Sequence, residues 1–152
     1  MTPEDLFAHT GTVAICGWAV LLFAPRRWPL LNAVPLVVIP ALLSGLYAVL
    51  ILRHFAESGG GYGTLAAVRV LLSADWMLLA GWVHFLAFDL FAGAWMARRM
   101  DEAGLGRVLQ APVLLSILYF GPLGFLLGLL ATGALRVPFG FVQRKEVGHA
   151  AI

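Results

Sequence analysis

Charged residues and cysteine are both scarce in this sequence. Only 12% of its 152 residues are charged, whereas soluble domains carry about 25%. Hydrophobic residues make up 61%, which is more than a soluble fold of this size can bury, so the composition predicts an integral membrane protein. The single cysteine, Cys16, allows no internal disulfide and no thiolate metal cage. These features exclude a secreted disulfide scaffold and a disordered chain.

Basic residues are too few for a protein that recognises nucleic acid. The sequence has ten Lys and Arg residues and eight Asp and Glu residues, which gives a formal net charge of +2. The basic residues come in pairs at the ends of apolar runs, such as Arg26-Arg27 and Arg98-Arg99. This arrangement is typical of residues that anchor and orient membrane helices. We therefore expect membrane lipid as a partner and no nucleic acid.

Four apolar runs are long enough to cross the hydrocarbon core as helices, which takes about 18 or more residues. They cover residues 6–23, 30–52, 76–97 and 108–135, and a short polar tail follows over 136–152. The sequence predicts an all-α integral membrane protein, a single domain over 1–152 that folds as a compact bundle of four transmembrane helices. Residues 64–75 predict an additional interfacial helix. Prolines inside the second and fourth runs predict kinks or breaks at Pro35, Pro40, Pro112 and Pro122.

The third run holds three ionisable side chains, Asp75, His84 and Asp89. A charged group in the middle of a membrane helix costs at least about 2.5–3.5 kcal/mol, so it normally faces the bundle and marks a functional path. Asp75, Trp82 and Asp89 are seven residues apart and therefore stack on one face of an α-helix. His84 lies about 140° around the helix from Asp89, on another face. That second face is aromatic and carries Phe88, Phe91 and Trp95.

Each of these residues also has a purely structural interpretation. Asp89 could pair with a hydroxyl group of another span, and His84 could bond to a carbonyl that a proline frees. Asp75 could cap its helix, and the aromatic face could serve packing or lipid contact. No spacing in the sequence is a metal signature, so we expect no metal and no cofactor. A ridge of small residues on the fourth run favours packing within the bundle: Gly121, Gly124 and Gly128.

Several motifs of the third and fourth runs occur together. They are Trp82-Val-His84, then Ala87-Phe-Asp89-Leu90-Phe91-Ala92, and then Phe120-Gly-Pro122-Leu-Gly124. In these motifs the chain resembles the plant neoxanthin-synthase family, which is known for the abscisic-acid-deficiency phenotype of its plant members, and its small bacterial relatives. The similarity runs from Asp75 to about Leu130 and is weaker at the first span.

The resemblance implies a four-helix membrane protein of the carotenoid pathway. Plant members are linked to the conversion of violaxanthin, a 5,6-epoxide carotenoid, to the allenic neoxanthin. Opening the epoxide needs a proton donor at its oxygen and forming the allene needs a base, but neither step needs a redox cofactor. We expect His84 and Asp89 to be this catalytic pair. The residues that we expect to bind the substrate are Trp82, Phe88, Phe91, Asp75 and Gly124.

Two functions follow as hypotheses. The first is an isomerase that acts on a carotenoid or related isoprenoid inside the bilayer. The second is a non-catalytic protein that binds such a molecule or helps to assemble a pathway complex. Both predict a hydrophobic small-molecule ligand in a lipid-accessible groove, which we expect between the third and fourth spans, beside Gly124 and reaching His84 or Asp89. A homo-oligomer is a partner that the sequence leaves open. The chain lacks the transit segment of plant members, so the expected location is a bacterial inner membrane.

Overall fold

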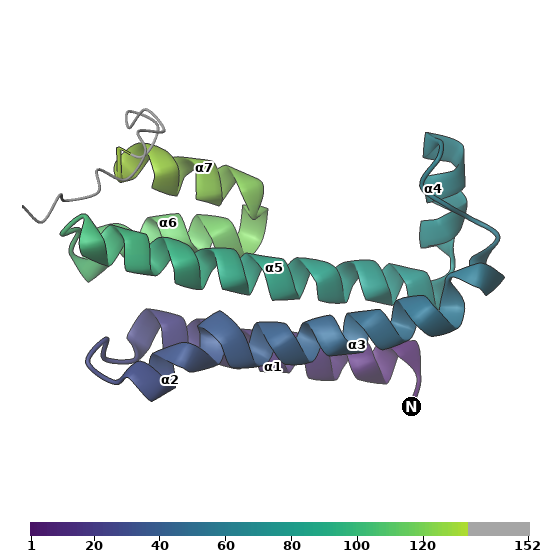
Figure 1. The fold of residues 1–152 in the computed structure, drawn as a ribbon, viewed down its shortest axis with the longest axis horizontal. Helices are drawn as coiled ribbons and strands as arrows, with labels where there is room; N and C mark the ends of the chain where they lie inside the picture. Colours follow the sequence, from purple (N-terminus) through teal and green to yellow (C-terminus); the bar gives the residue numbers. More distant parts are fainter. Residues whose placement is uncertain (134–152) are drawn as a thin grey trace, which may run out of the picture.

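Three long apolar helices form the body of the protein. The structure is a computed structural model that describes residues 1–133, and within this range all regular structure is helical (Figure 1). The long helices are α1 (Pro3–Phe23), a continuous helical stretch over Pro29–His54, and α5 (Asp75–Glu102). Each is long and apolar enough to cross a membrane, which indicates a multi-pass membrane protein. The first three predicted spans are confirmed as helices, with ends that differ by a few residues.

The second long helix is irregular near its start, where two prolines lie. It consists of α2 (Pro29–Ala33), a π-helical turn η1 (Val34–Val38) and α3 (Ile39–His54). Pro35 lies in the π-helical turn and Pro40 at the start of α3, where each lacks the N–H that an α-helix would use. The predicted disturbance at these two prolines is confirmed. Pro112, in contrast, lies inside α6 (Arg107–Phe120) without a break.

Helix α5 is the centre of the packing, with α1 and α3 along one side and α6 and α7 along the other (Figure 1). Two glycines allow α1 and α5 to approach closely. A Cβ atom added at Gly93 would lie 2.4 Å from the Trp18 ring, and one at Gly17 would lie 2.6 Å from Leu90. The side chains of Trp18 and Leu90 are buried and belong to one apolar core. Small residues are the usual means by which membrane helices pack at short range.

The fourth predicted span is corrected by the structure. The run does not form one helix over residues 108–135, because α6 ends at Phe120 and α7 (Pro122–Ala131) folds back beside it as a hairpin (Figure 1). At about 1.5 Å per residue, α6 extends roughly 21 Å and α7 roughly 15 Å, and the hydrocarbon core is about 30 Å thick. Neither helix alone has the length that a membrane span needs. The start of α6 and the end of α7 lie at the same end of the bundle (Figure 1).

Local chemistry at Gly121 explains the reversal. Gly121 has φ 36° and ψ −95°, a backbone conformation that residues with a side chain rarely adopt. Pro122 then starts α7 at a position where its missing N–H costs nothing. Gly124 lets the two helices touch, since a Cβ atom there would lie 2.1 Å from the Ile117 backbone nitrogen. The predicted break at Pro122 is confirmed, and it reverses the chain.

A short helix precedes α5, as predicted. The 3-10 turn η2 (Ala56–Ser58) and a glycine-rich loop lead to α4 (Leu65–Ser73), which Thr64 caps by accepting a hydrogen bond from the Ala67 N–H at 3.1 Å. Helix α4 stands at a steep angle to α5 at the end of the bundle that also holds the N-terminus (Figure 1). The polar tail predicted over 136–152 lies outside the described residues.

Candidate functional site

One face of α5 is covered over half of its length only. Residues seven apart on an α-helix lie within about 20° of one another, so Asp75, Trp82 and Asp89 share this face. The α6–α7 hairpin covers its C-terminal half: the Asp89 carboxylate packs against Gly121, and Met96 packs against Gly128. The N-terminal half of the same face therefore remains outside the hairpin.

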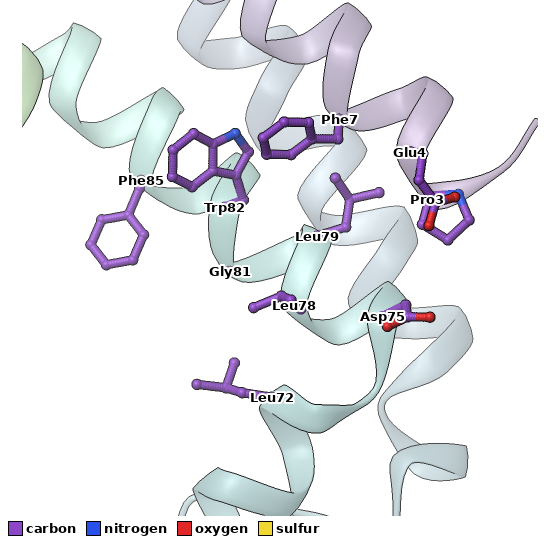
Figure 2. A pocket seen from close by; sticks show the side chains of 10 residues that line it. All are labelled: Pro3, Glu4, Phe7, Leu72, Asp75, Leu78, Leu79, Gly81, Trp82 and Phe85. Carbon is purple, nitrogen blue, oxygen red and sulfur yellow. The ribbon is translucent and has the colours of Figure 1, made fainter.

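A cavity of about 420 Å³ lies on this uncovered half, between α1, α4 and α5 (Figure 2). Its walls are almost entirely apolar. Glu4 and Asp75 are the only charged residues among the ten that line it. The lining residues are Pro3, Glu4, Phe7, Leu72, Asp75, Leu78, Leu79, Gly81, Trp82 and Phe85.

The start of α1 is fixed by a capping box, which positions the α1 side of the cavity. The Thr2 hydroxyl accepts a hydrogen bond from the Asp5 N–H at 3.2 Å, and the Thr2 N–H donates to the Asp5 carboxylate at 2.9 Å. Glu4 and Phe7, three residues apart, then face the cavity together. The Phe7 and Trp82 rings lie with their centroids 5.3 Å apart, and Figure 2 shows them opposite each other, away from Glu4 and Asp75.

The structure brings some of the predicted site residues together and separates others. Asp75 and Trp82, which the sequence predicts on one helix face and as substrate-binding residues, both line the cavity described above. Phe88 and Phe91 line a second apolar cavity of about 360 Å³ between α5 and the η1–α3 region. The His84 ring stacks on Phe88 with centroids 4.7 Å apart and lies 5.5 Å from the Tyr47 ring of α3. His84 thus belongs to the α3 side of α5.

Asp89 and Gly124 both belong to the hairpin contact. Asp89 lies near the midpoint of α5 and touches the tip of the hairpin, since a Cβ atom at Gly121 would lie 2.6 Å from its Oδ1 atom. Gly124 is buried where α7 crosses α6. The expected groove along the glycines of the fourth run is filled by these contacts. His84, Asp89 and Gly124 are all absent from the residues that line the two cavities, so the expected groove that reaches His84 or Asp89 is not found there.

Sequence reasoning missed the contribution of the N-terminus and of α4. Glu4 and Phe7 come from a segment far from Trp82 in the chain, and Leu72 belongs to the separate helix α4. No motif connects these three residues with Trp82. A signal was present at Glu4, because an acidic residue two positions before an apolar span needs a polar environment. Its position opposite Asp75 depends on how α1 packs on α5, which the sequence does not specify.

This arrangement can bind an elongated apolar molecule and transfer protons at its polar end. Apolar walls with a few polar groups are the usual composition of a small-molecule site. Two carboxyl groups at one cavity can act as proton donor and acceptor. Among residues 1–133, no group of three His, Cys, Asp or Glu side chains is placed to hold a metal ion.

Comparison with known proteins identifies one family. The sequence model of the family described as ABA DEFICIENT 4-like matches residues 5–127, which include α1 from its third residue on, α5, α6 and the first part of α7; Pro3 and Glu4 lie outside the match. The match also includes most of the cavity lining. Neither a curated protein nor a solved structure matches the chain.

Proposed function

Because this chain belongs to the ABA DEFICIENT 4-like family, we propose that it binds a carotenoid or related isoprenoid within the membrane and isomerises it by acid/base chemistry. The ligand would lie in the cavity between α1, α4 and α5. The location that we propose is a bacterial inner membrane. The motifs shared with the neoxanthin-synthase family lie partly on α5, which forms one wall of this cavity.

The observation that carries this proposal is the composition of the cavity. Apolar and aromatic groups surround it, and among its ten described lining residues the charged groups are the carboxyls of Glu4 and Asp75. A long hydrocarbon chain with an oxygen at its end ring matches this distribution, because the chain can contact Trp82 and Phe85 while the oxygen meets a carboxyl. In this proposal the ligand enters sideways from lipid, past Phe85 and Leu78, whose side chains are exposed at the cavity.

Two carboxyls, one that donates a proton to the substrate and one that accepts a proton from it, suffice for an isomerisation of the epoxide-opening type. A protonated carboxyl donates its proton to the epoxide oxygen as the carbon–oxygen bond breaks, which leaves a hydroxyl group. An ionised carboxyl removes a proton from the neighbouring chain carbon, and the electron pair of that C–H bond completes the allene. One proton is added and one is removed, so the product is an isomer of the substrate. We assign these two roles to Asp75 and Glu4.

His84 and Asp89, the pair favoured by the sequence, are the second candidate for these roles. Asp89 favours this alternative because it is a carboxyl near the middle of α5, on the same face as Trp82 and about 10 Å further along the axis. An end ring that reaches deeper than the cavity would approach the tip of the hairpin. The non-catalytic alternative keeps the same ligand and assigns both carboxyls to binding.

Expression in a carotenoid-producing host tests the proposal. Pigments are extracted and separated by chromatography from cells with the wild-type chain, with Asp75→Asn, with Asp89→Asn and with His84→Gln. We expect a new isomer of unchanged mass with the wild type and none with Asp75→Asn. Loss in Asp89→Asn and His84→Gln, with Asp75→Asn active, would assign the chemistry to the second pair. An unchanged pigment pattern with the wild-type chain would reject the isomerase.

A further inference from the structure

The two ends of the helix bundle differ strongly in charge. Five arginines gather at the end that holds the α1–α2 and α5–α6 turns, on the left in Figure 1: Arg26, Arg27, Arg98, Arg99 and Arg107. The opposite end, within residues 1–133, carries two: Arg53 and Arg69. Basic residues near span ends favour the cytoplasmic side, where anionic lipids are also concentrated. Within residues 1–133 this rule predicts that the arginine-rich end faces that surface.

A third cavity lies at this arginine-rich end. It has a volume of about 200 Å³ and is formed between the end of α1, the start of α2 and the last turns of α5. Leu21 and Ala94 give it an apolar part, while Arg26, Arg98 and Asp101 give it a charged part. An apolar part beside a charged part matches the boundary between the acyl chains and the headgroup of a lipid.

Arg26 is held in a defined position in this cavity. Its Nε atom lies 3.0 Å from Asp101 Oδ2, and its Nη1 atom donates to the Leu21 carbonyl at 3.1 Å. Buried Gln110 donates from Nε2 to Asp101 Oδ1 at 2.7 Å and to the Leu105 carbonyl at 2.8 Å, which fixes the carboxylate in turn. Burial lowers the pKa of the Arg26 guanidinium from its ordinary value, and Asp101 acts in the opposite direction.

Arg98 provides a second guanidinium at the same cavity. It precedes Asp101 by three residues, slightly less than one turn of α5, so both side chains lie on one side of the helix. Among the residues that the structure describes, Arg98 makes neither an ion pair nor a hydrogen bond, and its side chain is exposed. Asp101 can neutralise only one of the two arginines, so the cavity keeps an excess positive charge.

We propose that this cavity binds a phosphate group through Arg26 and Arg98. Guanidinium groups are well suited to phosphate oxygens, because their N–H donors match the spacing of two oxygens. The phosphate could belong to an anionic lipid headgroup, whose acyl chains would continue past Leu21 and Ala94, or to a soluble phosphate ester. This site and the cavity between α1, α4 and α5 lie at opposite ends of α5. The phosphate site does not depend on the function proposed for that cavity.

Native mass spectrometry of the purified chain in detergent tests this site. The probes are dioleoylphosphatidylglycerol, dioleoylphosphatidylcholine and inorganic diphosphate. We expect phosphatidylglycerol to bind more tightly than phosphatidylcholine, and Arg98→Gln to weaken it about fivefold, the factor that corresponds to about 1 kcal/mol per basic residue. Arg27→Gln is the matched control, since it removes the same charge at the same end from a side chain outside the cavity.

The outcomes separate a built site from general surface charge. An equal loss in Arg98→Gln and Arg27→Gln, or no loss in either, would overturn the proposal. Asp101→Asn removes the competing carboxylate and should strengthen binding of the anionic probes. If only phosphatidylglycerol depends on Arg98, the ligand is a lipid headgroup. If diphosphate shows the same dependence, the site takes soluble phosphates.

Discussion

Replacing Gly124 with alanine tests the helical hairpin. The added Cβ atom would lie 2.1 Å from the Ile117 backbone nitrogen, whereas ordinary contacts begin at 3.4 Å, so α6 and α7 would have to separate by about 1.3 Å. The colliding atom belongs to the backbone and cannot rotate away. Overpacking of this kind costs about 1–3 kcal/mol or more. This exceeds the gain of about 1 kcal/mol that alanine brings to a helix interior.

Gly45→Ala is the matched control for this change. Gly45 also lies inside a helix, but a Cβ atom there would meet nothing within 4 Å, so only the gain in helix propensity remains. Thermal unfolding in detergent, followed by circular dichroism, compares the two variants. We expect Gly124→Ala to melt roughly 5 °C or more below the wild type and Gly45→Ala to melt at or above it. Equal melting temperatures for the two variants would refute the close crossing at Gly124.

Two further predictions concern the ends of the bundle. The first uses a Cys16→Ser background and a water-soluble maleimide added to sealed vesicles. We expect the maleimide to label Glu102→Cys and Ala131→Cys from one side of the membrane and Glu57→Cys from the other. If Ala131→Cys is instead labelled from the same side as Glu57→Cys, the fourth run crosses the membrane. Arg107 donates hydrogen bonds of 2.6 and 2.7 Å to main-chain carbonyls at the end of α1, so Arg107→Gln should lower the free energy of unfolding by about 2 kcal/mol, measured by denaturant titration in detergent.

The sequence contained enough information for the three long helices, because length and hydropathy alone decide whether a helix can cross the bilayer. It was insufficient for the fourth run, where the apolar sequence continues past Gly121 although the chain reverses there. The Gly121-Pro122 pair is a turn signal in water, but in a membrane helix the same pair is tolerated as a kink. The positive φ of Gly121, the packing of Gly124 on α6 and the packing of Asp89 on Gly121 together distinguish the reversal from a kink.

The candidate site was predictable only in part, because local sequence patterns indicate some of its residues while others depend on helix packing. Helical periodicity alone places Asp75 and Trp82 on one face, and the structure finds both at one cavity. Periodicity also separates His84 from that face, as observed. Glu4 and Phe7 depend on contacts between helices that are distant in sequence, which no local pattern encodes. The roles of His84 and Asp89 in catalysis stay predictions.

Conversion of a purified substrate by the purified chain tests the central claim most directly. A 5,6-epoxide carotenoid in detergent is incubated with the wild type, with Asp75→Asn and with Glu57→Gln, and the products are separated by chromatography and weighed by mass spectrometry. Glu57→Gln is the control, because Glu57 is an exposed acid at the same end of the bundle but outside the cavity. We predict an isomer of unchanged mass, without any added cofactor, with the wild type and Glu57→Gln and none with Asp75→Asn. No isomer with the wild type, or equal conversion by Asp75→Asn, would contradict the account.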